Sequence, residues 1–209
     1  MGLLVQAGGA GGVCWEEDEV ITMASQRAQR YYVAISHDIP DSIQHDHPRL
    51  DILARLVLTR DQNHPGRLAE INGDGLQEAV SLARSQGLDD EYLEGRASIG
   101  DLSLNVFPAK SRGGGSRVRI TQLFPFDFDD ETRGPKFPAL LGLGIAHHAL
   151  KAVLCSLAQR LPADYKIYFP GNSNDSKAFF AKRGITPNTP LPLSEFIRRM
   201  EAWEKEKRM

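Results

Sequence analysis

Two segments of alternating hydrophobicity, joined by a glycine-rich stretch, constrain the fold of this chain most. In residues 97–110 (ASIGDLSLNVFPAK), Leu102, Leu104 and Val106 alternate with polar neighbours. SRGGGS follows, and residues 117–126 (RVRITQLFPF) begin a second alternating segment. A period of two residues places one face of each segment in a core. We therefore expect an antiparallel hairpin here.

The second segment changes its alternation midway. Val118 and Ile120 share one parity, but the next apolar residue, Leu123, falls at the other. A β-bulge inserts one extra residue into a strand and shifts the face of every residue after it. We therefore predict a bulge between Ile120 and Leu123.

The rest of the chain predicts strands and helices around this hairpin. Aromatic and β-branched residues indicate strands, and apolar residues at helical spacing indicate helices. On these grounds we expect strands at 30–36 and 164–171, and helices at 47–62, 74–87, 144–161, within 172–185 and at 193–209. The helix within 172–185 follows a polar N-cap segment and ends at Gly184, and the final helix presents Phe196 and Met200 for docking on the domain.

The composition limits the class of protein. With 209 residues and 41% hydrophobic content, the chain has the size of one domain with a substantial core. A formal net charge of −2 gives no reason to expect nucleic acid or an anionic membrane as the main partner. Two distant cysteines, a poor signal-peptide pattern and the lack of a long apolar segment favour a soluble, cytoplasmic protein. Residues 1–28, glycine-rich and then acidic, are expected to form a flexible arm.

The segment LGLGIAHHALK, residues 141–151, joins small residues to the start of a helix. Gly142, Gly144 and Ala146 stand two residues apart, and His147 and His148 follow on the first turn. A helix N-terminus presents free N–H groups and the positive end of the helix dipole, and small residues let a pyrophosphate approach the backbone. The spacing is neither G-x-G-x-x-G nor a P-loop. It indicates phosphate binding, with a plain small-residue loop as the alternative.

Residues 141–185 resemble the acetyl-CoA-binding half of the GNAT superfamily of N-acetyltransferases. In that family a bulged strand leads into a loop of the form Gln/Arg-x-x-Gly-x-Gly/Ala, and the next helix caps the cofactor pyrophosphate. Gly144 and Ala146 match the last two positions of that loop, DYKIYF resembles the family's fifth strand, and NSNDSKAFFAKRGI resembles its Asn-rich loop and helix. The resemblance implies an α/β (α+β) fold, an acyl-CoA N-acyltransferase-like mixed, mostly antiparallel sheet flanked by helices. It places an acetyltransferase-like domain at 29–192 and an extra C-terminal helix at 193–209.

The resemblance also assigns residues to acetyl-CoA or another acyl-CoA. It implies that the backbone around Gly144 holds the pyrophosphate and that the bulged strand holds the pantetheine. The residues it places at the acyl-CoA are Leu123, Phe124, Pro125, Arg133, Lys136, Gly142, Leu143, Gly144, Ile145, Ala146, His147, Asn172, Asn174 and Phe180. Leu141 stands at the family's Gln/Arg position, and Phe180 replaces the Tyr that often protonates the leaving thiolate.

Acyl transfer from a thioester to an amine needs a base, an oxyanion donor and an exit for the thiolate. The acidic segment DFDDE offers the carboxylates of Asp127, Asp129, Asp130 and Glu131 as bases, with a solvated loop as the alternative. His148 offers an imidazole that titrates near neutrality, although a histidine on a first turn is more often a surface residue. Backbone N–H groups near Leu123 would polarise the thioester carbonyl. The acceptor amine, small molecule or protein, and a homodimer stay open.

No metal site is expected from the sequence. Adjacent helix positions such as His147 and His148 do not share a face, and the HDH segment at 45–47 lacks a carboxylate at ligand-like spacing.

Two other functions stay as alternatives. A papain-like cysteine protease would use Cys14, His148 and Asp164, but the acidic residues after Cys14 disfavour a reactive thiolate. A catalytically degenerate acetyltransferase-fold module, used for binding or as an effector, is favoured by Leu141 and Phe180.

Overall fold

The computed structural model describes residues 30–43, 48–71, 73–108, 116–124, 128–129, 134–135, 137–171 and 173–208. The described residues form a mixed α+β structure, an open and mostly antiparallel sheet accompanied by helices. Residues 31–209 make up one compact unit. The arm expected at residues 1–28 lies outside the described residues. Among the described helices none has the length and apolar character needed to cross a membrane.

The sheet in the described part of the chain has six strands. In spatial order they are β1 (Tyr32–His37), β2 (Leu50–Thr59), β3 (Gly100–Phe107), β4 (Arg117–Phe124), β7 (Lys166–Tyr168) and β8 (Leu191–Pro192). Neighbouring strands are antiparallel except β4 and β7, which run parallel. A separate two-stranded ladder joins β5 (Phe128–Asp129) to β6 (Gly134–Pro135).

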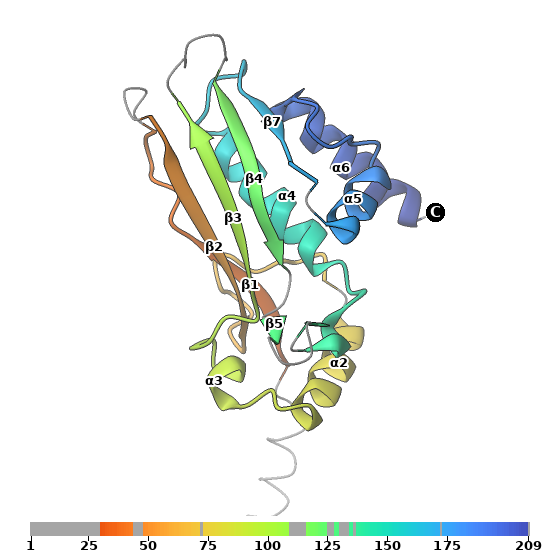
Figure 1. Cartoon of the computed structure of the whole chain (residues 1–209). Helices are drawn as coiled ribbons and strands as arrows, with labels where there is room; N and C mark the ends of the chain where they lie inside the picture. The colour runs from red at the N-terminus through yellow and green to blue at the C-terminus, as the bar shows by residue number, and fades with distance from the viewer. Residues whose placement is uncertain are drawn as a thin grey trace, which may run out of the picture. The chain divides into compact units, whose positions relative to one another are not determined.

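The described helices are α2 (Gly73–Ser85), α3 (Asp90–Leu93), α4 (Ile145–Ala158), α5 (Asn174–Ala181) and α6 (Leu193–Arg208), with a 3-10 turn, η1 (Pro138–Leu140). Helix α4 runs behind the sheet in Figure 1 and buries its apolar side against β1 and β4. Helix α6 packs on α4 and β7, and its Phe196 and Met200 are fully buried. The docking predicted for the final helix is therefore confirmed.

The predicted hairpin and its bulge are both present. β3 and β4 pair antiparallel, and the register skips Thr121, because Ile120 pairs with Leu104 and Gln122 pairs with Ser103. The extra residue lies inside the interval that the change of alternation indicated. Leu123 and Phe124 follow the bulge, and they pair again with Leu102 and Asp101 of β3.

The expected helix at 47–62 is wrong, because this segment forms β2. Ile52, Ala54, Leu56 and Leu58 are buried at a period of two. The same segment also carries apolar residues at helical spacing, and short apolar runs are ambiguous between the two periods. Pairing with β1 on one side and β3 on the other satisfies the backbone groups of β2 and decides for the strand.

The other expected elements are present with shorter bounds. Strands β1 and β7 and helices α2, α4, α5 and α6 lie within or close to the predicted segments. Ser173 caps α5 by accepting a hydrogen bond from the Ser176 N–H, and Gly184 has φ +64° just after the helix, as a helix-ending glycine requires. Strands β4 and β7 and helices α4, α5 and α6 were thus predictable from local patterns.

Candidate functional site

Strands β4 and β7 separate and leave a cleft between them. Their parallel pairing covers Arg117–Arg119 of β4 and ends at Tyr168 of β7. Figure 1 shows β4 and the segment after β7 diverging beyond this point. A cavity of about 230 Å³ lies there, lined by Ile120, Thr121, Gln122, Leu123, Phe169, Pro170, Gly171, Ser173, Ser176 and Phe180. We call it the strand cleft. Within the described residues, β4 has no paired strand on its β7 side from Ile120 onward, so its main chain offers hydrogen-bonding groups to a ligand there.

Two stacked aromatic rings and a glycine turn form one wall of the strand cleft. The Phe180 ring is fully buried and stacks on Phe169, with 3.9 Å between ring centroids. Gly171 has φ +65°, and a Cβ atom there would lie 2.7 Å from Pro187 Cβ, so only glycine fits the turn after β7. The bulge at Thr121 bends β4 at the same level.

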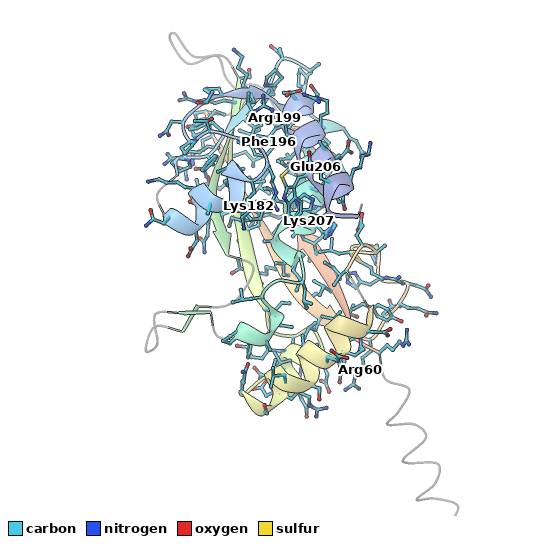
Figure 2. The ribbon with its side chains drawn as sticks, turned by 90° about the vertical axis from the view of Figure 1, so that its right-hand side faces the viewer. Arg60, Lys182, Phe196, Arg199, Glu206 and Lys207 are labelled. Atoms are coloured by element: carbon cyan, nitrogen blue, oxygen red, sulfur yellow. The ribbon has the colours of Figure 1, made fainter. Side chains whose placement is uncertain are left out.

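A second cavity, of about 700 Å³, lies at the N-terminus of α4. It is lined by Glu70, by the loop and first turn Leu140–His148, by Asp175, Ala178, Phe179, Lys182 and Arg183 of the α5 region, and by Trp203, Glu204 and Lys207 of α6. We call it the α4 pocket. Lys182, which follows α5, and Lys207 of α6 line the same pocket and are labelled in Figure 2.

The N-terminus of α4 has free donors at the α4 pocket. The N-cap is Gly144, with φ +78° and no side-chain hydrogen bond to the helix. The N–H groups of Ile145, Ala146 and His147 lie in the first turn and have no intrahelical acceptor. Together with the helix dipole, these groups favour an anion at this end of α4. Leu141 is 48% exposed at the rim and contributes no polar atom.

His147 is a buried residue, which contradicts the expectation of a surface histidine. Its side chain is 1% exposed, and its Nδ1 accepts a hydrogen bond of 3.1 Å from Arg183 Nε. Burial and the neighbouring Arg183 charge lower the pKa of His147 to about 3, so the ring is neutral. Because a guanidinium only donates, Nδ1 is unprotonated and the ring proton is assigned to Nε2. Nε2 is buried and has no hydrogen-bond partner among the described residues, which costs about 1–3 kcal/mol for a buried donor.

Arg183 is a buried cation held by aromatic rings. It is 6% exposed, and its guanidinium lies 3.6 Å from the Phe179 centroid and 4.0 Å from the Trp203 centroid. It also donates to the Phe179 carbonyl. Burial lowers the pKa of Arg183 to about 10, so the side chain stays charged at neutral pH. In the described part of the chain no carboxylate lies within 4.0 Å of it, although buried charges are normally paired.

A network of charged groups closes the other side of the α4 pocket. His148 Nδ1 lies 3.2 Å from Glu204 Oε1, and Lys151 Nζ lies 2.8 Å from Glu204 Oε2 and 3.6 Å from Glu70 Oε1. Although burial opposes it, the two carboxylates raise the pKa of Lys151 above its ordinary value. The network ties α4 to α6, and the two carboxylates share one lysine.

The cluster of His147, His148 and Glu204 has the composition of a metal site, but its hydrogen bonds disfavour one. One potential ligand atom from each residue lies within 4.8 Å of the others, and the two imidazole rings touch edge to face at 5.0 Å. The second nitrogen of His147 carries the ring proton, since Nδ1 is taken by Arg183. The charges of Arg183 and Lys151 also repel a cation. The cluster therefore fits a hydrogen-bonded network better than a cation site.

The residues expected at an acyl-CoA are distributed over both cavities. Gly142–His147 line the α4 pocket, and Leu123 and Phe180 line the strand cleft. Asn174 is exposed on the first turn of α5, where Ser173 and Ser176 line the cleft. Cys14, the HDH segment at 45–47, Pro125, Asp127, Asp130, Glu131, Arg133, Lys136 and Asn172 lie outside the described residues, and Phe124 and Asp129 are described by their backbone alone.

The cysteine-protease alternative needs His148 and Asp164 to lie close together. His148 lies on the first turn of α4, whereas Asp164 follows the other end of that helix, which rises about 15 Å between these points. The carboxylate beside His148 is that of Glu204. The described residues therefore give no support to a pairing of His148 with Asp164, and Cys14 lies outside them.

Several residues that line the α4 pocket were not found from the sequence, and four of them matter most for its charge and shape. They come from the end of α5 and from α6 and are Lys182, Arg183, Trp203 and Lys207. Phe179 with Arg183, and Trp203 with Lys207, stand four residues apart and so share a helix face. That spacing was a usable signal, but it does not say that the two faces meet.

The two cavities lie on different faces of α5. Ser176 and Phe180 face the strand cleft, while Phe179 and Lys182 face the α4 pocket.

Comparison of the chain with protein-family models, with curated proteins and with solved structures gives no match. What the chain binds therefore has to be inferred from these cavities.

Proposed function

We propose that this chain is an acyl-CoA-dependent N-acyltransferase, which moves an acetyl or other acyl group to an amine. The observation that carries the proposal is the strand cleft, where the bulged strand β4 parts from its parallel neighbour β7. The resemblance to the GNAT superfamily assigns the pantetheine arm to such a cleft and the pyrophosphate to the helix N-terminus after the bulged strand.

The chemistry of the two cavities suits the two ends of an acyl-CoA. Pantetheine is a flexible chain with two amide groups, and the unpaired edge of β4 at Ile120–Leu123 offers main-chain partners beside apolar rings. A diphosphate carries several acceptor oxygens, and the first turn of α4 offers donors without intrahelical acceptors. The charged end and the apolar arm of one ligand would thus meet different surroundings.

The reaction would proceed by direct attack in a ternary complex. The amine nitrogen forms a C–N bond to the thioester carbonyl carbon, the C–S bond breaks, and the thiolate leaves with the electron pair. The amine proton passes to a base, for which Asp127, Asp129, Glu131 and His148 are the candidates. Phe180 supplies no proton, so the thiolate would take one from water.

A catalytically inactive binding module is the second candidate. Phe180 is buried in an aromatic stack at the position where the resemblance expects an acidic hydroxyl, and Leu141 offers no polar atom at the loop. Such a protein would keep acyl-CoA binding and lack turnover.

Calorimetry with acetyl-CoA and CoA, followed by thiol release on a panel of amines, tests both candidates. We expect a dissociation constant in roughly the micromolar range and release of thiol with at least one amine. An absence of binding at millimolar acetyl-CoA contradicts both candidates. Binding without turnover on any amine would favour the module.

The Gly144→Val substitution tests the place of the diphosphate. Its side chain would be strained at φ +78° and would meet the His148 ring, which lies 3.5 Å from a Cβ atom at this position. We expect at least a roughly 100-fold loss of CoA affinity if the loop is displaced, equal to about 2.7 kcal/mol. Gly87→Val is the matched control, because Gly87 has φ +100° and lines neither cavity. Equal affinities for the two variants would mean that the diphosphate binds elsewhere.

A further inference from the structure

We infer that Arg183 and His147 bind one phosphate group of the diphosphate in the α4 pocket, and that Arg183, from the turn after α5, supplies the cation that Leu141 does not provide. This inference rests on the proposed function and adds two side chains to the backbone donors of α4. The resemblance placed His147 at the acyl-CoA through its backbone and gave Arg183 no role.

The first support is that Arg183 and His147 each have an N–H group available for a ligand. The Nε–H of Arg183 is used to hold His147, and one further donor is used on the Phe179 carbonyl. A guanidinium has more N–H groups than these two acceptors take. The Nε2–H of His147 is buried and lacks an acceptor among the described residues. Both side chains line the α4 pocket, so both have donors available for the same ligand.

The second support is the electrostatic balance of the pocket. Arg183 is a buried charge with no carboxylate within 4.0 Å in the described part of the chain, whereas Glu70 and Glu204 both contact Lys151. Lys182 and Lys207 line the same pocket (Figure 2). An anion with several acceptor oxygens would pair the buried charge and accept from His147 at once.

The third support is the way in which Arg183 is fixed. Its guanidinium lies between the Phe179 and Trp203 rings and donates to a neutral histidine, so its orientation is set without a carboxylate. Trp203 comes from α6, so the terminal helix acts as a positioning element for a cation at the N-terminus of α4. Such a site would prefer the planar, forked guanidinium over a lysine ammonium.

The test uses the full chain and titrates inorganic pyrophosphate, CoA and pantetheine into the Arg183→Met variant by calorimetry. We expect pyrophosphate and CoA to bind roughly 10- to 100-fold more weakly than to the wild type, the range for one charge-assisted hydrogen bond, with pantetheine unchanged. Arg183→Lys should recover part of the affinity. Lys177→Met, on the same helix, lines neither cavity and should behave as the wild type.

Wild-type protein provides a measurement that does not depend on the variant folding. Pyrophosphate should move the His147 Nε2–H resonance downfield in ¹H–¹⁵N spectra, because this proton gains an acceptor. An unchanged resonance in the pyrophosphate complex, or equal pyrophosphate affinities of Arg183→Met and the wild type, would overturn the inference.

The outcomes separate this inference from the proposed function. Arg183-dependent binding of pyrophosphate without any binding of acetyl-CoA would support the anion site and reject the acyltransferase. Acetyl transfer that is unaffected by Arg183→Met would support the acyltransferase and reject the role of Arg183.

Discussion

The strand cleft and the α4 pocket share the short helix α5 but are built on different physical grounds. The strand cleft is lined by strand edges, by aromatic rings and by no charged side chain of the described residues. The α4 pocket is lined by six acidic or basic side chains from three regions of the chain: Glu70, Asp175, Lys182, Arg183, Glu204 and Lys207. The strand cleft results from the separation of two strands, whereas the α4 pocket results from charged side chains that tertiary packing brings together.

This difference indicates where stability and recognition lie. Phe180 at the strand cleft is part of the hydrophobic core, so its packing stabilises the fold whatever the chain binds. At the α4 pocket, Arg183 and His147 are buried polar groups whose pairing is incomplete within the described residues, which lowers stability in the absence of a ligand. We therefore expect substitutions on the two faces of α5 to affect different measurements.

The largest effect is expected for Phe180→Ala compared with Phe179→Ala. Phe180 is fully buried and stacked on Phe169, so its truncation should lower the free energy of unfolding by about 3–5 kcal/mol. Phe179 is half-buried and packs on Arg183, so we expect a loss of roughly 1–2 kcal/mol together with weaker pyrophosphate binding. Urea unfolding measures the first quantity and calorimetry the second. Equal losses of stability in the two variants would break the comparison.

The second prediction concerns the pH dependence of stability. The pKa of His147 is about 3 in the folded protein and 6.5 for an unperturbed histidine, so between these values the unfolded chain binds the extra proton. Stability should therefore fall as the pH is lowered below 6.5, by up to about 1.4 kcal/mol per pH unit from this residue. Unfolding by urea between pH 4.5 and 7.5 measures the slope.

The control variants for this slope are His147→Gln and His64→Gln. The first removes the imidazole that faces Arg183, His148, Lys151 and Glu70, and its slope should be shallower than that of the wild type. The second changes a turn outside both cavities and should keep the wild-type slope. A wild-type slope in His147→Gln would show that the histidine is not the group that titrates.

The same contrast explains what could be predicted from the sequence. The bulge at Thr121, the small-residue loop before α4 and the cap of α5 each depend on a few consecutive residues, and all three were recognisable as local patterns. The exception was β2, where one apolar run satisfied both a helical and a strand period. Pairing with the two neighbouring strands, β1 and β3, selected the strand for β2. Such pairing cannot be predicted from the sequence of the segment alone.

Of the α4 pocket, only the backbone donors at the N-terminus of α4 could be predicted from the sequence. Gly144 and Ala146 indicated an anion at the helix N-terminus, but Arg183 and Trp203 reach that point from distant segments. His147 looked like a surface residue because a first-turn position says nothing about which helix packs over it, and α6 does so here, with Trp203 at 4.7 Å from the His147 ring. Side-chain meetings of this kind depend on tertiary packing rather than on spacing.

The smallest effect is expected for Ser173→Ala at the N-terminus of α5. Ser173 Oγ accepts from the Ser176 N–H at 3.1 Å, and its loss should lower the free energy of unfolding by about 1 kcal/mol, the usual value of an N-cap. Because Ser173 lines the strand cleft while Arg183 lies beyond the other end of the helix, the affinity for pyrophosphate should stay unchanged. Ser85→Ala, in the last turn of α2, is the control and should change stability by less than about 0.5 kcal/mol. A loss of pyrophosphate affinity in Ser173→Ala would mean that α5 couples the two cavities, because fraying at one end would then move the guanidinium at the other.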